Sequence, residues 1–255
     1  MSQPIVLNQK TALEMLPTRT AESHKGSYGK VLAVCGSSSY RGAAVLSVMG
    51  ALRTGAGLVT LAAPECVVSA AACQVPEAIF LPDPSENRLL EEVSQSEVCL
   101  LGCGLPADAA TAQLAKKALD ASMGVVVLDA GALCSLADDI SAITAFAQSQ
   151  PLIVTPHPGE MARLCRCSVE DIEKERTSCA LDFALSTGAI TVLKGHETLI
   201  ACPDGTLYEN LTGNAGLARG GSGDILAGMI AGLAAQGMSA EHAAAAGGFL
   251  HGLSA

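Results

Sequence analysis

The sequence predicts an α/β domain in which a mainly parallel central sheet is covered by helices on both faces. The 255-residue chain is 49% hydrophobic and only 16% charged, which is enough apolar sequence for a thick, multilayer core. The apolar residues are mostly Ala, Val, Leu and Ile, and aromatic residues make up only 3%. Short β-branched runs also alternate with longer Ala- and Leu-rich segments, which is the rhythm of repeated βα units.

The expected strands are almost continuously apolar, as is typical of parallel strands that are buried on both faces. They are VLAVC (31–35), LVTLA (58–62), VCLLGC (98–103), VVVLD (125–129), LIVT (152–155) and ITVLK (190–194). Two later runs, TLIAC and TLYEN, flank Pro203-Asp204-Gly205 and predict an antiparallel β-hairpin. No linker or fixed-period repeat divides the chain, so we expect one domain over residues 1–255.

The composition argues against several classes of partner and site. The net charge of −10 gives no general attraction to nucleic acid or to anionic membranes. No apolar run is long enough to span a bilayer, and the first residues lack the pattern of a secretory signal. The ten cysteines include no CxxC pair and no His partners at zinc-site spacing. We therefore expect a cytoplasmic protein with reduced, mostly buried thiols and with neither membrane nor nucleic-acid partners.

Ligands of such sheets bind beyond the carboxyl ends of the strands, so the residues after each strand are the candidates for chemistry. They are GSSSYRGAA (36–44), GCGLP (102–106), DAGAL (129–133), PHPGE (156–160) and KGHET (194–198). The first segment lacks the Gly-Lys-Ser/Thr ending of a P-loop, and the second is only part of a dinucleotide fingerprint. The amides of residues 42–44 either face a ligand at a helix start or simply form a tight turn.

Two of these segments place polar side chains in defined positions. PHPGE holds His157 between two prolines, a rigid frame in which a ligand contact costs little entropy. Glu160 is interpreted as a residue that favours the N-terminus of the helix that follows. Lys194 ends a strand and is a candidate phosphate partner, although a solvated hairpin entry explains KGHET equally well.

The segment NAGLARGGSGDILAG (214–228) carries the strongest signal. Apolar residues recur at helical spacing in its second half and beyond, so a buried helix is expected to begin near Ser222. Residues 220–223 then form the N-terminus, where unobstructed amides and the helix dipole favour an anion. Gly228 and Gly232 on the same helix would allow close packing against a neighbour.

Asp224 lies in the first turn of that helix, beside the expected anion. An acid there stabilises a helix start by only about 0.3–1 kcal/mol. The four consecutive small residues 220–223 are more than capping alone requires. A hydroxyl that attacks a phosphoryl group needs an acid–base residue beside it and amides that hold the developing charge. The segment therefore predicts phosphoryl transfer with Asp224 as base, and the helix dipole is expected to keep this carboxylate ionised and weakly basic.

Taken together, these motifs resemble a known family. The glycine-rich segment with Asp224 is similar to the GGTGD anion hole and catalytic aspartate of the ribokinase-like superfamily. In order, HKGSYGKVLAVCGSSSYRGAA, TPHPGEMARL, VLKGHETLI and this segment resemble the NAD(P)H-hydrate dehydratase family from about His24 onward. The resemblance implies a three-layer α/β/α fold and repair of nicotinamide cofactors. ADP or ATP would phosphorylate the added hydroxyl of NADHX or NADPHX, and loss of phosphate would restore the dihydronicotinamide.

The resemblance also implies a role for each matching residue, with Asp224 as the base and residues 221–223 as the anion hole. The nucleotide side would comprise Lys194, Gly195, His196, Glu197, Thr198 and Gly223. The anion hole would comprise Gly221, Ser222 and Gly223. The hydrate side would comprise Ala43, Gly104, His157 and Asp224. Mg²⁺ is implied as a phosphate counterion, but the sequence shows no compact carboxylate cluster, so no residue is assigned to a metal. A homo-oligomer is also implied, with a tetramer as one arrangement.

Three residues depart from the family pattern. Arg219 stands where Thr is common and adds a cation near the phosphate, whereas Ser222 keeps the hydroxyl of the usual Thr. Gly131 replaces an acidic residue and removes a possible polar contact. The chain ends at HGLSA, where the last helix of the family would continue, which is consistent with a missing final segment.

Two other functions remain open from the residues alone. A small-molecule kinase of the same fold would share the GGSGD chemistry, although PHPGE and KGHET together favour the dehydratase. A nucleotide sensor without turnover would keep the fold, although the intact Asp224 argues against it.

Overall fold

Among residues 3–255, which the computed structural model describes, ten strands form one sheet. They are β1 (Ile5–Val6), β2 (Lys30–Val34), β3 (Leu58–Ala63), β4 (Ile79–Pro82), β5 (Val98–Leu101), β6 (Val125–Leu128), β7 (Leu152–Val154), β8 (Ile190–Leu193), β9 (Thr198–Ala201) and β10 (Leu207–Asn210). Their order in space is β1-β10-β9-β8-β7-β6-β5-β2-β3-β4. Neighbouring strands are parallel except in the pairs β8–β9 and β9–β10.

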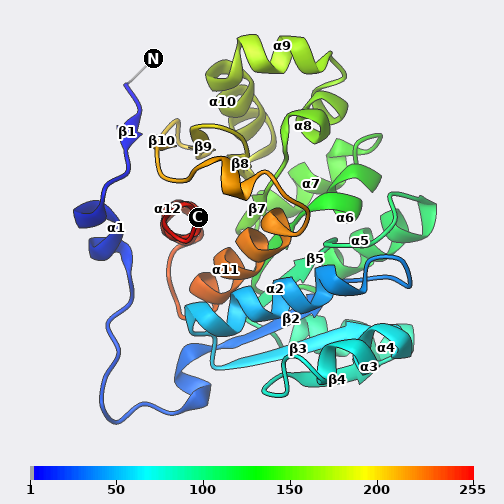
Figure 1. Cartoon of the computed structure of the whole chain (residues 1–255). Helices are drawn as coiled ribbons and strands as arrows, with labels where there is room; N and C mark the ends of the chain where they lie inside the picture. Colours follow the sequence, from blue (N-terminus) through cyan, green and yellow to red (C-terminus); the bar gives the residue numbers. More distant parts are fainter. Residues whose placement is uncertain (1–2) are drawn as a thin grey trace.

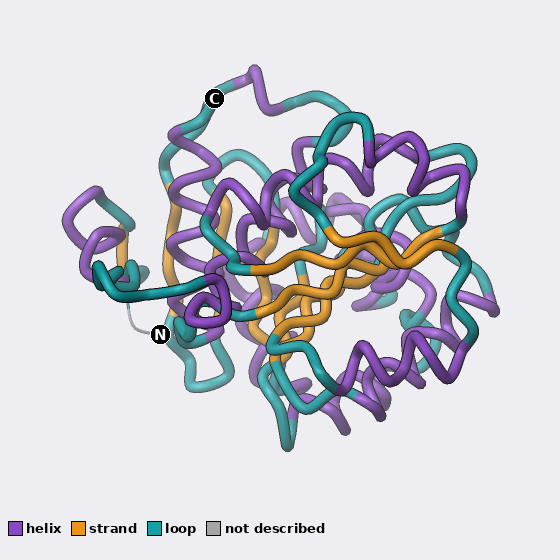
Figure 2. Tube along the Cα trace, turned by 90° about the horizontal axis from the view of Figure 1, so that it is seen from below, coloured by secondary structure: helices purple, strands orange, loops and turns teal. Residues whose placement is uncertain are grey.

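Helices cover both faces of this sheet, so the architecture has three layers (Figures 1 and 2). The helices are α1 (Gln9–Met15), α2 (Arg41–Thr54), α3 (Glu65–Ala72), α4 (Glu86–Ser94), α5 (Ala109–Ala121), α6 (Ala130–Ser135), α7 (Ile140–Ala147), α8 (Pro158–Cys165), α9 (Val169–Lys174), α10 (Arg176–Thr187), α11 (Ser222–Ala235) and α12 (Ala240–Leu253), with 3₁₀ turns η1 (Lys25–Tyr28) and η2 (Ala215–Leu217). The expected mainly parallel α/β fold is confirmed.

All six strands expected from apolar runs are present, and the late hairpin of β9 and β10 is confirmed. The edge strands β1 and β4 were not predicted. β1 is only two residues long and both are exposed, and β4 is partly exposed and ends at Pro82. Edge strands tolerate proline and need not be apolar on both faces, so they lack the pattern of a buried parallel strand.

The central strands separate two hydrophobic cores. Side chains alternate across β2, so that Val31 and Ala33 belong to one core and Leu32 and Val34 to the other. Helices α2, α3, α11 and α12 cover the first core, and helices α4 to α10 cover the second. Burial on both faces explains why these strands read as continuous apolar runs.

Helix α11 packs against α2 at backbone distance, side by side in Figure 1. A Cβ atom added at Gly228 would lie 2.0 Å from the carbonyl oxygen of Ser47, and one at Gly50 would lie 2.5 Å from that of Ile225. One added at Gly232 would also meet α2 backbone at 2.5 Å. The expected close packing through Gly228 and Gly232 is therefore confirmed, and it fixes where α11 begins relative to the sheet.

The thiols and helices bear on two further expectations. All ten cysteines are free, and Cys35, Cys99, Cys103 and Cys202 are buried. Cys66, Cys73 and Cys165 are exposed, so the expected burial of the thiols holds for only part of the set. Within residues 3–255, no helix has both the length and the apolar character that a membrane crossing requires.

We predict that Gly228→Ala lowers the free energy of unfolding by about 1–3 kcal/mol, because the added methyl group forces α11 away from α2. Gly248→Ala in α12 is the matched control, since its Cβ would meet the nearest atom, Ile200 Cδ1, at an ordinary 3.7 Å. The control should be neutral or stabilising by up to about 1 kcal/mol, because alanine favours a helix interior. Urea unfolding measures both variants, and equal destabilisation would contradict the prediction.

Candidate active site

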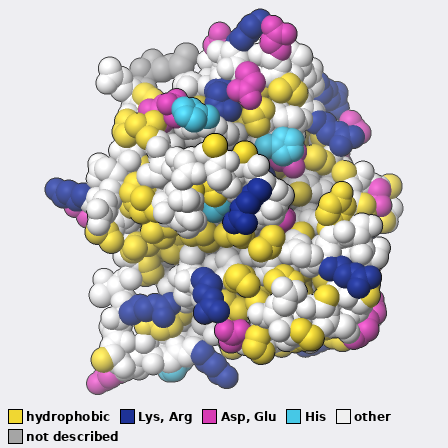
Figure 3. Space-filling view, in the orientation of Figure 1, with side chains coloured by type: hydrophobic (Ala, Val, Ile, Leu, Met, Phe, Trp, Pro, Cys, Tyr) yellow, Lys and Arg dark blue, Asp and Glu magenta, His cyan; other side chains and the backbone are white. Residues whose placement is uncertain are grey.

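A pocket of about 780 Å³ lies at the carboxyl ends of β6 and β8 and at the N-terminus of α11. The hairpin end after β10 and the last turns of α12 complete its walls. On the face shown in Figure 3, basic and acidic side chains are interspersed without a continuous patch of either sign. An anionic ligand must therefore be held by the local groups of this pocket.

Most of the residues predicted for the site line this pocket. The lining includes His157, Lys194, Gly195, His196, Glu197, Thr198, Gly221, Ser222, Gly223 and Asp224. Ala43 and Gly104 do not line it, but they lie against each other, since a Cβ at Gly104 would be 2.6 Å from that of Ala43. Gly104 follows Cys103, whose thiol donates to Asp129 Oδ2 at 3.4 Å and whose sulfur lies within 4.8 Å of a carboxylate oxygen of Asp224.

The N-terminus of α11 is built to leave its amides open. The helix begins at Ser222, as predicted, and its N-cap is Gly221, with φ of 89° and no side-chain hydrogen bond to the first turn. A positive φ suits glycine, and a cap without a side chain leaves the first amides available for an anion. A Cβ at Gly223 would lie 3.3 Å from Lys194 Nζ, so this glycine leaves room for the ammonium group.

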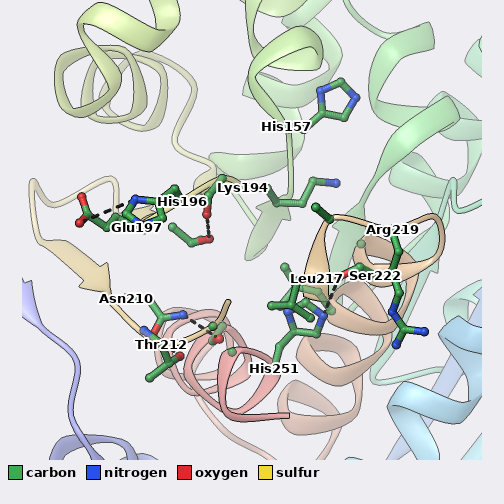
Figure 4. A pocket seen from close by; sticks show the side chains of 18 of the residues that line it. His157, Lys194, His196, Glu197, Asn210, Thr212, Leu217, Arg219, Ser222 and His251 are labelled. Carbon is green, nitrogen blue, oxygen red and sulfur yellow. Dashed lines mark hydrogen bonds and ion pairs between the residues drawn. The ribbon is translucent and has the colours of Figure 1, made fainter. Parts of the chain in front are cut away.

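Lys194 extends from the end of β8 toward this helix start (Figure 4). Its Nζ lies 2.7 Å from Asp129 Oδ1 and 3.6 Å from Glu160 Oε2. Burial disfavours the charged form, but the carboxylates of Asp129 and Glu160 outweigh burial and raise the pKa of Lys194. The side chain is therefore a permanent cation beside the anion site, and the solvated-hairpin interpretation of this lysine is wrong.

Asp129 follows β6 and is only 2% exposed. Its Oδ1 accepts hydrogen bonds from Lys194 and from Thr155 Oγ1, both at 2.7 Å, and its Oδ2 accepts one from Cys103 Sγ at 3.4 Å. The next residue, Ala130, has φ of 45°, a strained conformation that occurs mainly where surrounding structure imposes it. The segment DAGAL (129–133) was among those expected to supply site residues, and Asp129 is its polar side chain.

The departure at Gly131 has a steric reason. A Cβ at this position would lie 2.0 Å from the carbonyl oxygen of Leu105, so in this chain an acidic side chain would collide with backbone.

Asp224 lies in the first turn of α11 with its carboxylate near Asp129 and Cys103. Burial, followed by the negative charge of Asp129, raises the pKa of the Asp224 carboxyl, and the nearby Cys103 thiol and the Lys194 charge oppose this only in part. The expectation that the helix dipole keeps Asp224 weakly basic is therefore wrong in direction. Desolvation and a neighbouring like charge exceed the effect of the dipole.

His157 and Glu160 form the start of α8. His157 is the N-cap, and its Nδ1 accepts from the amides of Gly159 at 3.0 Å and Glu160 at 3.3 Å. Glu160 Oε2 in turn accepts from the amide of His157 at 2.8 Å, which confirms its expected helix-start role. The imidazole is 56% exposed at the pocket edge, and its Nε2 lies 3.6 Å from Glu160 Oε1.

The turn after β8 lines the pocket mainly through its backbone. Gly195 has φ of 150° and packs against Arg176, and Thr198 Oγ1 donates to the Gly195 carbonyl at 3.1 Å. The His196 side chain is 94% exposed and lies beside Glu197, as Figure 4 shows. These two side chains therefore form the outer rim, where any contact with a nucleotide would be made in solvent.

Sequence reasoning missed one group that the fold brings from the far end of the chain. His251 on α12 is buried, and its Nε2 lies 3.3 Å from Ser222 Oγ (Figure 4). Burial lowers the pKa of His251, which favours the neutral imidazole beside the anion hole. Asn210, also from the pocket wall, donates through Nδ2 to the Gly248 carbonyl at 2.9 Å. His251 is one of two histidines in an Ala-rich helix and has no local signal that sets it apart, so only the tertiary structure identifies it.

The acidic groups of the site were expected to be dispersed, but the structure brings some together. Ligand atoms of Cys103, Asp129 and Asp224 all lie within 4.8 Å of one another. The expectation that no compact cluster exists is therefore corrected. The cluster is not an all-oxygen cage, because one of its ligand atoms is the Cys103 sulfur and Asp129 already binds Lys194. A hydrogen bond with Cys35, followed by burial, raises the pKa of the Cys103 thiol and disfavours the thiolate that would bind a metal.

Comparisons with known proteins agree with this arrangement. Residues 31–255 match the family model of NAD(P)H-hydrate dehydratase. The chain is 43% identical over 247 residues to the bifunctional NAD(P)H-hydrate repair enzyme Nnr of Moorella thermoacetica, covering 93% of this chain and 46% of that relative. The chain thus spans about half the length of this bifunctional relative.

Solved structures extend the likeness to three dimensions. The ADP/ATP-dependent NAD(P)H-hydrate dehydratase from Bacillus subtilis, co-crystallised with ATP/Mg²⁺, is 33% identical with a TM-score of 0.84, covering 99% of this chain and 88% of that one. A ribokinase-like superfamily protein from Enterococcus faecalis V583 is 30% identical with a TM-score of 0.84, covering 98% and 86%. This chain has the ribokinase-like fold, and it belongs to the NAD(P)H-hydrate dehydratase family.

Proposed function

We propose that this chain uses ADP or ATP to dehydrate NADHX and NADPHX, and thereby restores NADH and NADPH. The observation that carries the proposal is the position of Asp224, a half-buried carboxylate in the first turn of a helix whose amides are open to an anion. Membership of the dehydratase family and the ATP/Mg²⁺ complex of the Bacillus subtilis relative support it.

The nucleotide phosphates would lie between the start of α11 and Lys194. Backbone amides of residues 221–223 and the helix dipole favour the terminal phosphate, and the Lys194 ammonium adds a fixed positive charge. The turn at residues 195–198 would contact the rest of the nucleotide along the pocket wall. The hydrate would approach from the side of Ala43, Gly104 and His157.

Asp224 then meets the hydroxyl group of the hydrate. The hydroxyl oxygen attacks the terminal phosphorus, the bond from phosphorus to the bridging oxygen breaks, and Asp224 takes the hydroxyl proton. A raised pKa makes this carboxylate a better base than an exposed aspartate. The ring nitrogen lone pair then expels phosphate, and loss of a proton from the adjacent ring carbon restores the double bond.

Mg²⁺ would enter this pocket with the nucleotide phosphates. It prefers hard oxygen ligands, so the Cys103 thiol does not suit it, and Glu160 Oε2 already accepts a hydrogen bond from the His157 amide at 2.8 Å. When bound, the ion would neutralise charge on the phosphoryl group in transfer. Phosphate oxygens and water would supply most of its ligands, because Asp129 is already paired with Lys194.

Location and assembly are part of the proposal. Free thiols throughout a chain of this size fit the reducing cytoplasm, so we predict a cytoplasmic location. A homo-oligomer, with a tetramer as one arrangement, also remains a prediction, and light scattering of the purified protein measures it directly.

The first test of the proposal is Asp224→Asn, which keeps the shape of the side chain and removes the base. Recovery of NADH absorbance from NADHX in the presence of ADP or ATP should fall about 10²–10⁴-fold. Binding of ADP, measured by calorimetry, should change little. Asp120→Asn, at an exposed position of α5, is the control and should match the wild type.

Two results of the same assay would assign a different function. Accumulation of a stable phosphorylated alcohol would identify a kinase, and ADP binding without turnover by the wild type would identify a sensor.

Asp224→Asn is also expected to raise the free energy of unfolding at neutral pH. Because burial and Asp129 raise its pKa above the ordinary 3.8, the folded protein holds this proton more tightly than the unfolded chain does. The resulting stability is present in acid and is lost as pH rises through the folded pKa. In urea unfolding, the variant should therefore have a higher free energy of unfolding than the wild type at neutral pH, and this difference should vanish in acid. A difference that grows toward acid would contradict the prediction.

Lys194→Met should weaken ADP binding roughly 10–100-fold, because one charge-assisted contact to phosphate is lost. It should also lower the free energy of unfolding by about 3–5 kcal/mol, because Asp129 is left buried without its partner. Lys117→Met is the control, since Lys117 pairs with Glu86 on the surface and such pairs contribute only about 0–1 kcal/mol. Unchanged ADP affinity in the Lys194 variant would exclude its phosphate role.

A further inference from the structure

Four ionisable side chains meet between β6, β8, α8 and α11, and three of them are acids. The Lys194 ammonium lies 2.7 Å from Asp129 and 3.6 Å from Glu160. On its other side, Asp129 lies near Asp224, since their ligand atoms and that of Cys103 fall within 4.8 Å of one another. One cation thus faces three carboxylates, so the position of each group depends on the others.

Asp129 is the member of this set that binds Lys194 and also lies near Asp224, and both of its carboxylate oxygens accept hydrogen bonds. Thr155 Oγ1 and Lys194 both donate to Oδ1 at 2.7 Å, and the Cys103 thiol donates to Oδ2 at 3.4 Å. The backbone is fixed too, because its amide donates to the Leu101 carbonyl at 3.1 Å. A buried carboxylate with this many partners has little freedom to move.

We propose that Asp129 is a positioning residue for the reaction: it holds the Lys194 ammonium at the phosphate site and keeps a fixed negative charge beside Asp224. The inference rests on the proposed function and adds a residue to it. Asp129 need not touch either substrate, because it acts through the two side chains that do. Lys194 Nζ, held in this way, lies 3.3 Å from the place of a Cβ at Gly223, at the start of α11.

Loss of the Asp129 charge has two consequences that act in the same direction. Lys194 would be drawn to the remaining acids, Glu160 and Asp224, and away from the phosphate. Asp224 faces Asp129, Cys103, Lys194 and Glu160, and of these the Asp129 charge most strongly raises its pKa. Without that charge, and with Lys194 closer, the Asp224 carboxyl becomes a weaker base.

The test is Asp129→Asn, assayed for NADHX turnover with ADP across the pH range. We expect kcat/KM to fall roughly 100-fold, as for a misplaced catalytic group. The acidic limb of the pH profile should move down by about one pH unit, because a like charge beside Asp224 is removed. Glu92→Gln is the matched control, a buried carboxylate paired with Lys30 and Arg88 outside this pocket. The control should leave the limb unmoved.

Thr155→Val separates the two roles of Asp129 and is informative even if Asp129→Asn folds poorly. The substitution removes one hydrogen bond to the Asp129 carboxylate but keeps the charge of Asp129. The value of kcat/KM should therefore fall, while the acidic limb of the pH profile stays in place. The inference is overturned if Asp129→Asn is folded and its acidic limb coincides with that of the wild type. It is also overturned if Thr155→Val moves the limb as far as Asp129→Asn does.

A readout without turnover keeps the inference separate from the proposed function. The Asp224 carboxyl can be titrated by ¹³C NMR in the wild type and in Asp129→Asn without any substrate. A lower pKa in the variant supports the inference even if NADHX is not turned over, in which case only the proposed function fails. An unchanged pKa in the variant overturns the inference while leaving the dehydratase proposal intact.

Discussion

The contact between α2 and α11 sets the geometry on which the pocket depends. Gly228 meets the Ser47 carbonyl and Gly50 meets the Ile225 carbonyl at distances that exclude any side chain. Because a packed helix pair cannot slide without creating overlap or a cavity, this contact fixes the axis and the register of α11. The first turn of α11 therefore has a defined position above the sheet ends, and Asp224 meets the segments after β5, β6 and β8 there. A packing requirement in the middle of the helix thus fixes the position of the proposed base at its start.

In the proposed function, an acidic protein must hold anions by local means. The chain carries a net charge of −10, so the pocket relies on helix amides and on one buried lysine. Burial alone would lower the pKa of Lys194, but the carboxylates of Asp129 and Glu160 outweigh burial and raise this pKa. The same acids repel a phosphate, whereas the Lys194 ammonium lies 3.3 Å from the place of a Cβ at Gly223, at the start of α11. His251, neutral and bonded to Ser222, supports the anion hole without adding a charge.

The features predicted from sequence are those whose signal is local. Continuous apolar runs identified the central strands, and the rule that parallel strands present their carboxyl ends together brought Lys194, His157 and Asp224 to one region. The edge strand β1 carried no such signal, because both of its residues are exposed. His251 and the partners of Asp129 depend on contacts between distant parts of the chain, which one sequence cannot reveal. The predicted direction of the Asp224 pKa shift was wrong for the same reason. The helix dipole is a local effect, whereas burial and the charge of Asp129 come from the tertiary structure.

The placement of Asp224 shows how activity and stability oppose each other at this helix start. An acid in the first turn of an exposed helix is stabilised by the dipole, by about 0.3–1 kcal/mol. Here burial and Asp129 reverse that benefit for the ionised form, so the fold carries a carboxylate that it would hold more easily protonated. A base must be able to accept a proton in the transition state, and a raised pKa provides this. Cys103 and Lys194 favour the ionised form but offset burial and Asp129 only in part, so in the proposed reaction the proton of the substrate hydroxyl would remove the remaining cost.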